Sequence, residues 1–315
     1  MPSFEDTIEA LVAHQRLRPS QIRQLSGLAS EQLRQLRGVW ATLPDPERMN
    51  LLASLRRHAE EDSLTDFDAI YQAAMDDRNG DVRRVAVSAV LGDRDVGVLT
   101  KMLELCASDP EEIVRATAAE RLGGFAYEAE VGTLPRETAA QIEKVLLERV
   151  QSETEAPNVR ARALASVGYL STDAVKREIR RAMTRESLRI AAIRAIGRNL
   201  DPEWTDLLTE QMASDDPAIR QEAAEAAADY EDTVDALTDL VDDPVVAVRL
   251  AAISSLGKIG SAEAKDALIY CFESNDPVIK KAATAALHEI EATEDPLGTA
   301  GPEWDDEDED EEESS

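Results

Sequence analysis

Few residues in this sequence form a pattern that could carry out acid–base, nucleophilic or metal chemistry. The three histidines, His14, His58 and His288, lie far apart, and none has the neighbours of a metal-binding motif. The sequence contains no His-Glu-x-x-His, no paired Cys-x-x-Cys, no glycine-rich phosphate loop and no Gly-x-Ser-x-Gly. We therefore predict no catalytic residue, no metal site and no cofactor, and expect the protein not to be an enzyme.

Residues 176–198 are the segment in which functional groups do gather. They hold eight basic residues against Glu178 and Glu186, a local charge of +6 in a chain of net charge −30. The planar fork of arginine suits bidentate contacts with carboxylates or phosphates. This composition predicts a docking site for an acidic protein partner, and the alternative is that the same side chains pair with acids nearby in the fold. The candidate partner-binding residues are Lys176, Arg177, Arg180, Arg181, Arg185, Arg194 and Arg198.

A second, smaller basic excess lies in residues 15–39. Its five arginines face a single acid, Glu31, and they are Arg16, Arg18, Arg23, Arg34 and Arg37.

The charge balance of the whole chain limits its partners. The 64 acidic residues outnumber the 34 basic ones, which argues against general binding to nucleic acid or to an anionic membrane. The basic residues are 27 arginines and only 7 lysines. Acid-rich, lysine-poor surfaces are typical of proteins from very salty cytoplasm, where screening weakens self-repulsion. We expect a cytoplasmic protein from a halophilic archaeon, with an acidic protein of ordinary salinity as the alternative.

The elements that would position these groups are repeated helices. Seven segments share one pattern around a basic residue, which we call the anchor: Arg83, Arg115, Arg160, Arg189, Arg220, Arg249 and Lys280. An apolar residue precedes every anchor, and three residues after it stands an alanine in all seven: Ala86, Ala118, Ala163, Ala192, Ala223, Ala252 and Ala283. Positions four residues apart lie on one face of a helix, and alanine lets a second helix approach closely.

Each repeat is predicted to be a helical hairpin. Four segments carry Asp-Pro shortly before the anchor, at residues 109–110, 216–217, 243–244 and 276–277, and Asp followed by Pro is a helix-start signal. A further apolar stretch lies upstream of each segment. Cys106 and Cys271 both stand nine residues before an anchor, which predicts small buried residues on the first helix.

A basic residue in the first turn of a helix faces the positive end of the helix dipole, so its recurrence implies acidic partners. We interpret the seven anchors as a structural ladder that ties repeat to repeat through aspartates of the same or the next hairpin. A stripe of ligand-binding arginines is the alternative interpretation.

The pattern D-P-x-V-R-x-x-A-x-x-A-L-G resembles the HEAT repeat and its short prokaryotic form, the phycobilisome-lyase HEAT-like repeat. Residues 111–123 and 246–260 match it best, and the resemblance covers residues 70–290. It implies an all-α fold, an α-solenoid of about seven HEAT-like hairpins in two layers plus a helical N-terminal cap. In that family the solenoid surface usually binds other proteins.

Three regions are predicted from these observations. Residues 1–66 form a helical cap or a small docking domain, residues 67–290 the solenoid, and residues 291–315 a disordered acidic tail. Ten of the thirteen residues from Glu303 to Ser315 are acidic, which indicates a solvating tail or one that docks on a basic partner. The 45-residue spacing between Arg115 and Arg160 predicts an inserted loop over residues 125–138.

The function expected from these features is that of a non-enzymatic scaffold or adaptor that binds proteins, in signalling, taxis or complex assembly. We expect the protein to be a monomer. The sequence contains no run of about 18 apolar residues, so we predict no membrane span. Two alternatives remain: chromophore attachment or chaperone activity like that of the bilin lyases, and nucleic-acid binding through the Arg-rich central repeats.

Overall fold

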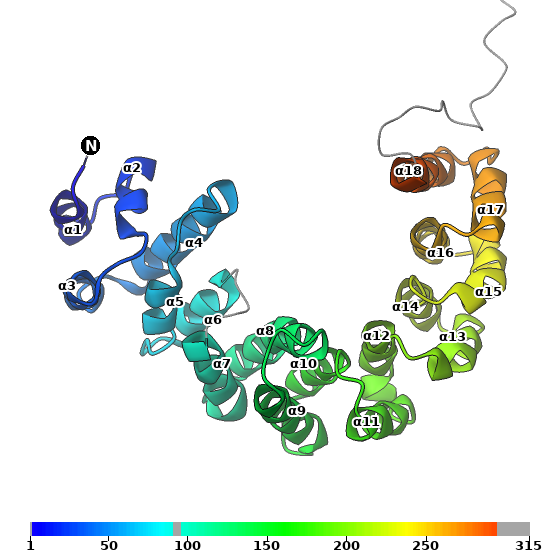
Figure 1. Cartoon of the computed structure of the whole chain (residues 1–315), viewed down its shortest axis with the longest axis horizontal. Helices are drawn as coiled ribbons and strands as arrows, with labels where there is room; N and C mark the ends of the chain where they lie inside the picture. Colours follow the sequence, from blue (N-terminus) through cyan, green and yellow to red (C-terminus); the bar gives the residue numbers. More distant parts are fainter. Residues whose placement is uncertain (1, 91–95, 295–315) are drawn as a thin grey trace, which may run out of the picture. The chain divides into compact units, whose positions relative to one another are not determined.

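The computed structural model describes residues 2–90 and 96–294, and within these ranges the chain is helical without a strand. Figure 1 shows helices α1 to α18 connected by short turns. The bounds of the first nine are α1 Phe4–Val12, α2 Pro19–Ile22, α3 Ser30–Trp40, α4 Asp45–Glu61, α5 Asp68–Ala74, α6 Gly80–Ala89, α7 Val96–Ser108, α8 Glu112–Glu130 and α9 Arg136–Gln151. The remaining nine are α10 Pro157–Val167, α11 Asp173–Met183, α12 Arg189–Asn199, α13 Thr205–Met212, α14 Pro217–Ala226, α15 Val234–Asp239, α16 Val246–Ile259, α17 Ala262–Phe272 and α18 Pro277–Glu294.

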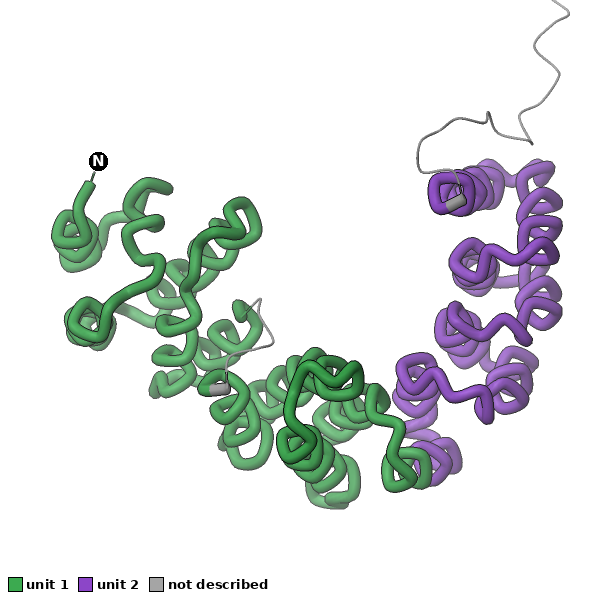
Figure 2. The backbone as a smooth tube through the Cα atoms, viewed as in Figure 1, with its two compact units in different colours: residues 1–178 green, residues 179–315 purple. Residues whose placement is uncertain are grey.

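The chain divides into two compact units, drawn in different colours in Figure 2. Unit 1 runs from Met1 to Glu178 and unit 2 from Ile179 to Ser315, so the boundary falls inside α11. Apart from the last residues of α18, the acidic tail predicted over 291–315 lies outside the described residues.

Unit 1 is a stack of hairpins in two layers. The second helices of successive hairpins, α4, α6, α8 and α10, contact one another in order, and so do the first helices α3, α5, α7 and α9. The hairpin of α3 and α4 thus continues the stack toward the N-terminus. Ahead of it, Ser3 caps α1 through a capping box with Asp6.

Unit 2 repeats the same arrangement. Helices α12, α14, α16 and α18 form one layer, and α13, α15 and α17 form the other (Figure 1). This confirms the predicted α-solenoid of antiparallel helical hairpins.

The alanines of the predicted column lie where the second helices pack on one another. All seven alanines three residues after the anchors are fully buried. One turn further on, glycines bring the helices closer still: a Cβ placed on Gly197 would lie 2.8 Å from the Cα of Ala226 in α14. Gly257 faces Ala286 of α18 in the same way, at 2.8 Å from its Cβ. Small side chains are therefore needed on both sides of these helix pairs.

The insertion is more helical than the sequence predicts. The loop expected over residues 125–138 is wrong for its first part, because α8 continues to Glu130 and the connection to α9 is short. Phe125 and Ala126 are buried, so the extra turns of α8 bury apolar surface that a loop would expose. The turn is confined to residues 131–135. Gly132 adopts a φ of 82° there, and Pro135 directly precedes the first residue of α9.

Candidate functional site

The anchors of unit 1 reach carboxylates of the following hairpin. Arg83 donates Nε and Nη2 to the two oxygens of Asp109, at 2.7 and 2.8 Å. Arg115 donates to Glu155, with Nη2 to Oε1 at 2.8 Å. Arg48, at the equivalent position of α4, donates Nη1 to Asp77 at 2.6 Å and is 2% exposed. We call each such pair a rung, and every rung joins two consecutive hairpins.

Unit 2 contains rungs of the same kind. Arg220 donates Nε and Nη2 to Asp243, at 2.6 and 3.1 Å, and Arg249 donates Nη2 to Asp276 at 3.3 Å. Lys280, the anchor of the last described hairpin, lies over the Phe272 ring with Nζ 4.5 Å from its centroid. A cation held over an aromatic face is itself a favourable contact.

A second contact anchors each guanidinium to its own hairpin. Nη1 of Arg83, Arg115, Arg220 and Arg249 donates to the carbonyl oxygen six residues earlier, at 2.7–2.9 Å. The anchor thus satisfies a carbonyl at the end of the connection between the two helices of its hairpin. These arginines fix the geometry of the turn as well as the contact with the next hairpin.

Arg160 and Arg189 differ from this pattern. Arg160 donates Nε to the carbonyl of Val150 at 3.0 Å, and Arg189 donates Nε to that of Met183 at 3.3 Å. In the described part of the chain neither pairs with a carboxylate. Three rungs use an aspartate six residues before the next anchor, Asp77, Asp109 or Asp243, and two use Glu155 or Asp276, five and four residues before it. In the hairpins that follow Arg160 and Arg189, the position six before the anchor is Met183 or Ser214.

The four Asp-Pro pairs also serve two different purposes, which the sequence pattern did not separate. Asp216 and Asp276 stand four residues before their anchors and cap α14 and α18, accepting from Ala218 N and Val278 N at 2.9 Å, and Asp276 also accepts from Arg249. Asp109 and Asp243 stand six residues before theirs, are buried and form rungs.

The predicted docking arginines of residues 176–198 have separate environments. Arg177 and Arg181 are exposed, with no ion pair or hydrogen bond of their side chains in the described part of the chain. Arg180 is exposed but pairs with Glu203, and its guanidinium carbon lies 4.9 Å from the centre of the Trp204 ring. Lys176 and Arg185 are half-buried, and Nη1 of Arg185 is a buried donor without a partner.

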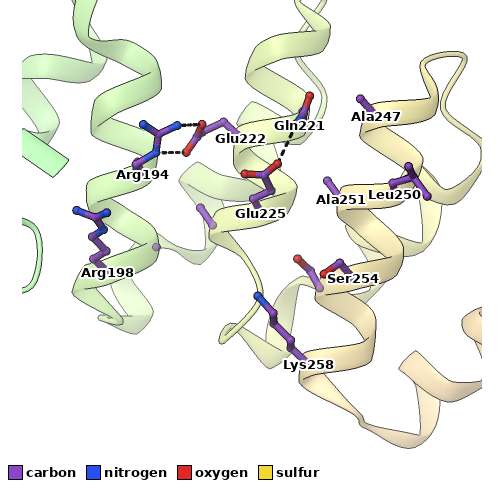
Figure 3. Close-up of a pocket in the computed structure, with 13 residues that line it drawn as sticks. Arg194, Arg198, Gln221, Glu222, Glu225, Ala247, Leu250, Ala251, Ser254 and Lys258 are labelled. Atoms are coloured by element: carbon purple, nitrogen blue, oxygen red, sulfur yellow. Dashed lines mark hydrogen bonds and ion pairs between the residues drawn. The ribbon is translucent and has the colours of Figure 1, made fainter. Parts of the chain in front are cut away.

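The other two predicted docking residues, Arg194 and Arg198 of α12, line a groove in unit 2. It has a volume of about 670 Å³ and crosses α12, α14 and α16 (Figure 3). Its floor is made of small side chains, among them Ala226, Ala251 and Ser255. Lys258 of α16 adds a third cation, and the acids of the groove are Glu222 and Glu225. The groove therefore carries one more basic than acidic group in a strongly acidic chain.

Lys258 was missed by the sequence analysis, although the repeat pattern carried a signal for it. Arg198 and Lys258 both stand nine residues after an anchor, Arg189 and Arg249. Equivalent positions of different repeats lie on the same face of the solenoid. A cation shared by two repeats was therefore a better indicator of a common surface than the density of arginines along the chain.

Arg194 and Glu222 close one end of the groove. Nε and Nη2 of Arg194 donate to the two oxygens of Glu222, at 2.8 and 2.5 Å (Figure 3). Burial raises the pKa of the Glu222 carboxyl, and the hydrogen bonds from Arg194 offset this only in part. Gln221 donates to Glu225 at 2.9 Å, whereas Lys258 is exposed. Arg198 and Lys258 line the rest of the groove.

The histidines and cysteines of the described residues lie apart from one another in separate environments. No group of three or more His, Cys, Asp or Glu side chains in the described ranges could hold a metal ion. His14 lies 2.8 Å from Glu47 near the N-terminus, and His58 is buried against Phe67. Both cysteines are buried on first helices, α7 and α17, as their spacing predicts. Burial raises the thiol pKa to about 12 at Cys106 and about 11 at Cys271.

The second basic excess, in residues 15–39, is spread over separate contacts. Arg23 pairs with Asp62 at 2.9 Å, Arg34 pairs with Glu31, and Arg18 donates Nε to Gln21 at 3.4 Å. Arg16 lines a cavity of about 380 Å³. These arginines do not combine into one ion-pair cluster in the described structure.

Comparison with known proteins identifies the repeat. Residues 142–228 and 226–288 match the family of HEAT repeats. The hairpins of this stretch are therefore similar to HEAT repeats. No curated protein is similar enough in sequence to count as a relative.

Three solved structures are similar to this chain at low sequence identity. The YibA protein of Escherichia coli is 16% identical with a TM-score of 0.46, over 88% of this chain and 99% of that one. An engineered protein is 17% identical with a TM-score of 0.42, over 90% and 88% of the two chains. Human deoxyhypusine hydroxylase in complex with glycerol is 15% identical with a TM-score of 0.35, over 90% and 97%.

In the part of the chain that the structure describes, no helix is both long enough and apolar enough to cross a membrane.

Proposed function

We propose that this protein is a non-enzymatic adaptor that binds an acidic segment of a partner protein in the groove of α12, α14 and α16. The observation that supports this most is the row of Arg194, Arg198 and Lys258 along one groove, in a chain whose net charge is −30. Cations collected on one surface against the charge of the whole molecule select acidic partners.

The shape of the groove suits a peptide better than a small molecule. Its floor of alanine and serine leaves room for side chains of the partner, and its cations stand on the rim, where a bound chain keeps contact with solvent. Ligand pockets for small molecules are instead mostly apolar and enclosed. HEAT repeats are known for protein binding along such surfaces, which agrees with an adaptor role in signalling, taxis or complex assembly.

The remaining features of the proposal concern where the adaptor works. We infer a monomer in the cytoplasm of a halophilic archaeon, with repeats of the phycobilisome-lyase-like type. The excess of acids and the 27 arginines against 7 lysines support the high-salt setting. In such a cytoplasm, long-range steering is screened, so short-range arginine–carboxylate hydrogen bonds would provide the selectivity.

The test uses the full chain and fluorescent peptides rich in Asp and Glu, with binding followed by fluorescence anisotropy. The variant Lys258→Glu should weaken binding about tenfold while its helicity and melting temperature stay unchanged, because Lys258 is exposed. Lys144→Glu, which makes the same charge change on exposed α9, is the matched control and should bind more strongly than the groove variant.

A competing site is tested in the same assay. The variant Arg177→Glu/Arg181→Glu removes the two exposed arginines of α11 that have no side-chain partner in the described structure. If this variant loses peptide binding and the groove variant keeps it, the docking site lies on α11 and the groove proposal is wrong. A pull-down from native extract at high salt would then identify the partner.

A further inference from the structure

One position of the repeat has the same role in three hairpins. The residue six before the anchor is Asp77, Asp109 or Asp243, and all three are buried. One oxygen of each carboxylate accepts the backbone N–H two residues later, at 2.8–2.9 Å. The other oxygen accepts a hydrogen bond from the arginine anchor of the preceding hairpin, at 2.6–2.7 Å. An anion at this position therefore joins a turn to the hairpin before it.

Ser214 occupies this position in the hairpin of α13 and α14. Its Oγ accepts the backbone N–H of Asp216 at 3.2 Å, as the aspartates do in the other turns. Its carbonyl accepts Nη1 of Arg220 at 2.8 Å, which is the contact that Asp77, Asp109 and Asp243 make with their own anchors. The turn thus has the same hydrogen bonds, but a neutral hydroxyl stands where the carboxylate would be.

Arg189 is the anchor that this position would serve. It lies on α12, which packs on α14, and its side chain donates Nε to the Met183 carbonyl at 3.3 Å. Throughout the described ranges it has no ion pair, whereas Arg220 and Arg249 of the same unit each hold an aspartate. A half-buried guanidinium without a counter-charge would gain from an anion at Ser214.

We propose that Ser214 is a phosphorylation site and that its phosphoryl group completes the rung with Arg189. A phosphoserine carries a charge of about −1.5 to −2 and three acceptor oxygens. These suffice to keep the contact with the Asp216 N–H and to accept from Arg189. Phosphorylation would join the hairpin of α13 and α14 to α12, as the carboxylates do elsewhere.

The surroundings of Ser214 suit a protein kinase. Ser214 lies in the turn between α13 and α14, and its neighbours Ala213, Asp215 and Asp216 are exposed. The two acids that follow the serine fit a kinase with a basic substrate cleft. In the reaction the γ-phosphoryl group of ATP forms a bond with Ser214 Oγ, the bond to the β-phosphate breaks and ADP leaves, and the hydroxyl proton passes to a base of the kinase.

Ser274 provides the matched control. It stands six residues before Lys280, and its Oγ accepts the Asp276 N–H at 3.2 Å. The anchor before it, Arg249, already pairs with Asp276 at 3.3 Å. A phosphoryl group on Ser274 would therefore meet an anchor that already has a carboxylate.

The experiment compares full-length proteins that carry phosphoserine at position 214 or at position 274, introduced during translation. Thermal unfolding is measured at pH 8 and low ionic strength, where the phosphate is a dianion and screening is weak. We expect phosphoserine at 214 to raise Tm by about 2–4 °C, the shift typical of one such interaction. The same modification in the Arg189→Gln background, and phosphoserine at 274, should not raise it.

Acceptor competence is tested separately with the unmodified full chain, ATP and an acid-directed serine kinase, followed by mass-spectrometric mapping. Phosphate on Ser214 supports the proposal, and its absence there overturns it. The proposal also fails if phosphoserine at 214 leaves Tm unchanged or lower, or raises it equally without Arg189. These outcomes are independent of peptide binding in the groove.

Discussion

Arg83 holds the carboxylate of Asp109 with two parallel hydrogen bonds, of 2.7 and 2.8 Å, across the contact between successive hairpins. Both side chains are almost wholly buried, with 10% and 2% of their surfaces exposed. The same arginine donates Nη1 to the Asp77 carbonyl at 2.8 Å. One buried guanidinium therefore connects the turn of its own hairpin to the turn of the next, and its hydrogen bonds compensate for burying the charge.

The first prediction concerns this pair. Asp109→Asn keeps the size of the side chain but leaves the buried Arg83 charge uncompensated, and should lower the free energy of unfolding by about 2–4 kcal/mol. The measurement is urea unfolding followed by circular dichroism. Glu104→Gln on α7 is the control, because Glu104 is 61% exposed and contacts only Lys101 at 3.3 Å, and should change stability by less than about 0.5 kcal/mol. Equal effects of the two substitutions would contradict the ladder.

The second prediction is that two carboxylates of unit 2 respond to pH with opposite sign. The pKa of Asp243 is lowered, chiefly by the hydrogen bonds from Arg220, so its stabilising contribution is lost as pH falls below the ordinary value of 3.8. The pKa of Glu222 is raised by burial, so its ionised form disfavours folding, and protonation below neutral pH removes this cost.

Urea unfolding from pH 7 down to pH 3 checks both signs. At pH 7, Asp243→Asn should have a lower free energy of unfolding than the wild type. This difference should shrink as pH falls, because the wild type then loses its ionised Asp243. Glu222→Gln should lower the free energy of unfolding only slightly at pH 7. Its deficit relative to the wild type should grow as pH falls through the raised pKa of Glu222, because the wild type then becomes more stable. The assignment of these roles fails if the two variants follow the same pH trend.

The sequence predicted the packing of this molecule better than its charge contacts. The seven alanines were identified from spacing alone and are all buried, because helical periodicity fixes which side chains face the neighbouring helix. Spacing could not separate Asp109, which forms a rung, from Asp216, which caps a helix. A shift of two residues moves the carboxylate from the preceding hairpin to the N-terminus of its own helix.

The candidate site was predicted in part for the same reason. Arg194 and Arg198 were found by charge density, yet Arg180 from the same cluster contacts Glu203 and Trp204 away from the groove lining. Neighbours along a chain of hairpins belong to different layers, so charge density in sequence mixes several surfaces. Position within the repeat separates them, as the shared position of Arg198 and Lys258 shows.

The third prediction compares two glycines that differ only in the space beside them. Gly197→Ala should destabilise unit 2 by about 1–3 kcal/mol, because its Cβ would lie 2.8 Å from the Cα of Ala226 and a backbone atom cannot rotate away. Gly38→Ala in α3 has no atom within 4 Å of the new Cβ and should stabilise by about 0.5–1 kcal/mol. Melting temperatures of the two variants should therefore move in opposite directions. A rise for Gly197→Ala would show that the helices separate at low cost.

The fourth prediction is that neither cysteine reacts in the folded protein. Cys106 and Cys271 are 0% and 2% exposed, and burial raises their thiol pKa to about 12 and about 11, so little thiolate exists at pH 8. A disulfide reagent such as 5,5′-dithiobis(2-nitrobenzoate) should label both only in denaturant. Cys271 should be the faster of the two under native conditions, because its pKa is raised less. Rapid stoichiometric labelling without denaturant would mean that the first helices open readily.

The fifth prediction concerns the alanine column and uses one helix as its own control. Ala252 of α16 is fully buried, so Ala252→Asp places a carboxylate without a partner between packed helices, at a cost of several kcal/mol. Ala247→Asp makes the same chemical change five residues earlier, where the side chain is exposed in the first turn. An acid there faces the positive end of the helix dipole and should leave stability unchanged or slightly higher. Ala192→Asp on α12 should repeat the effect of Ala252→Asp. Normal melting of both buried variants, measured beside Ala247→Asp, would contradict the assignment of position three after the anchor to the helix contact.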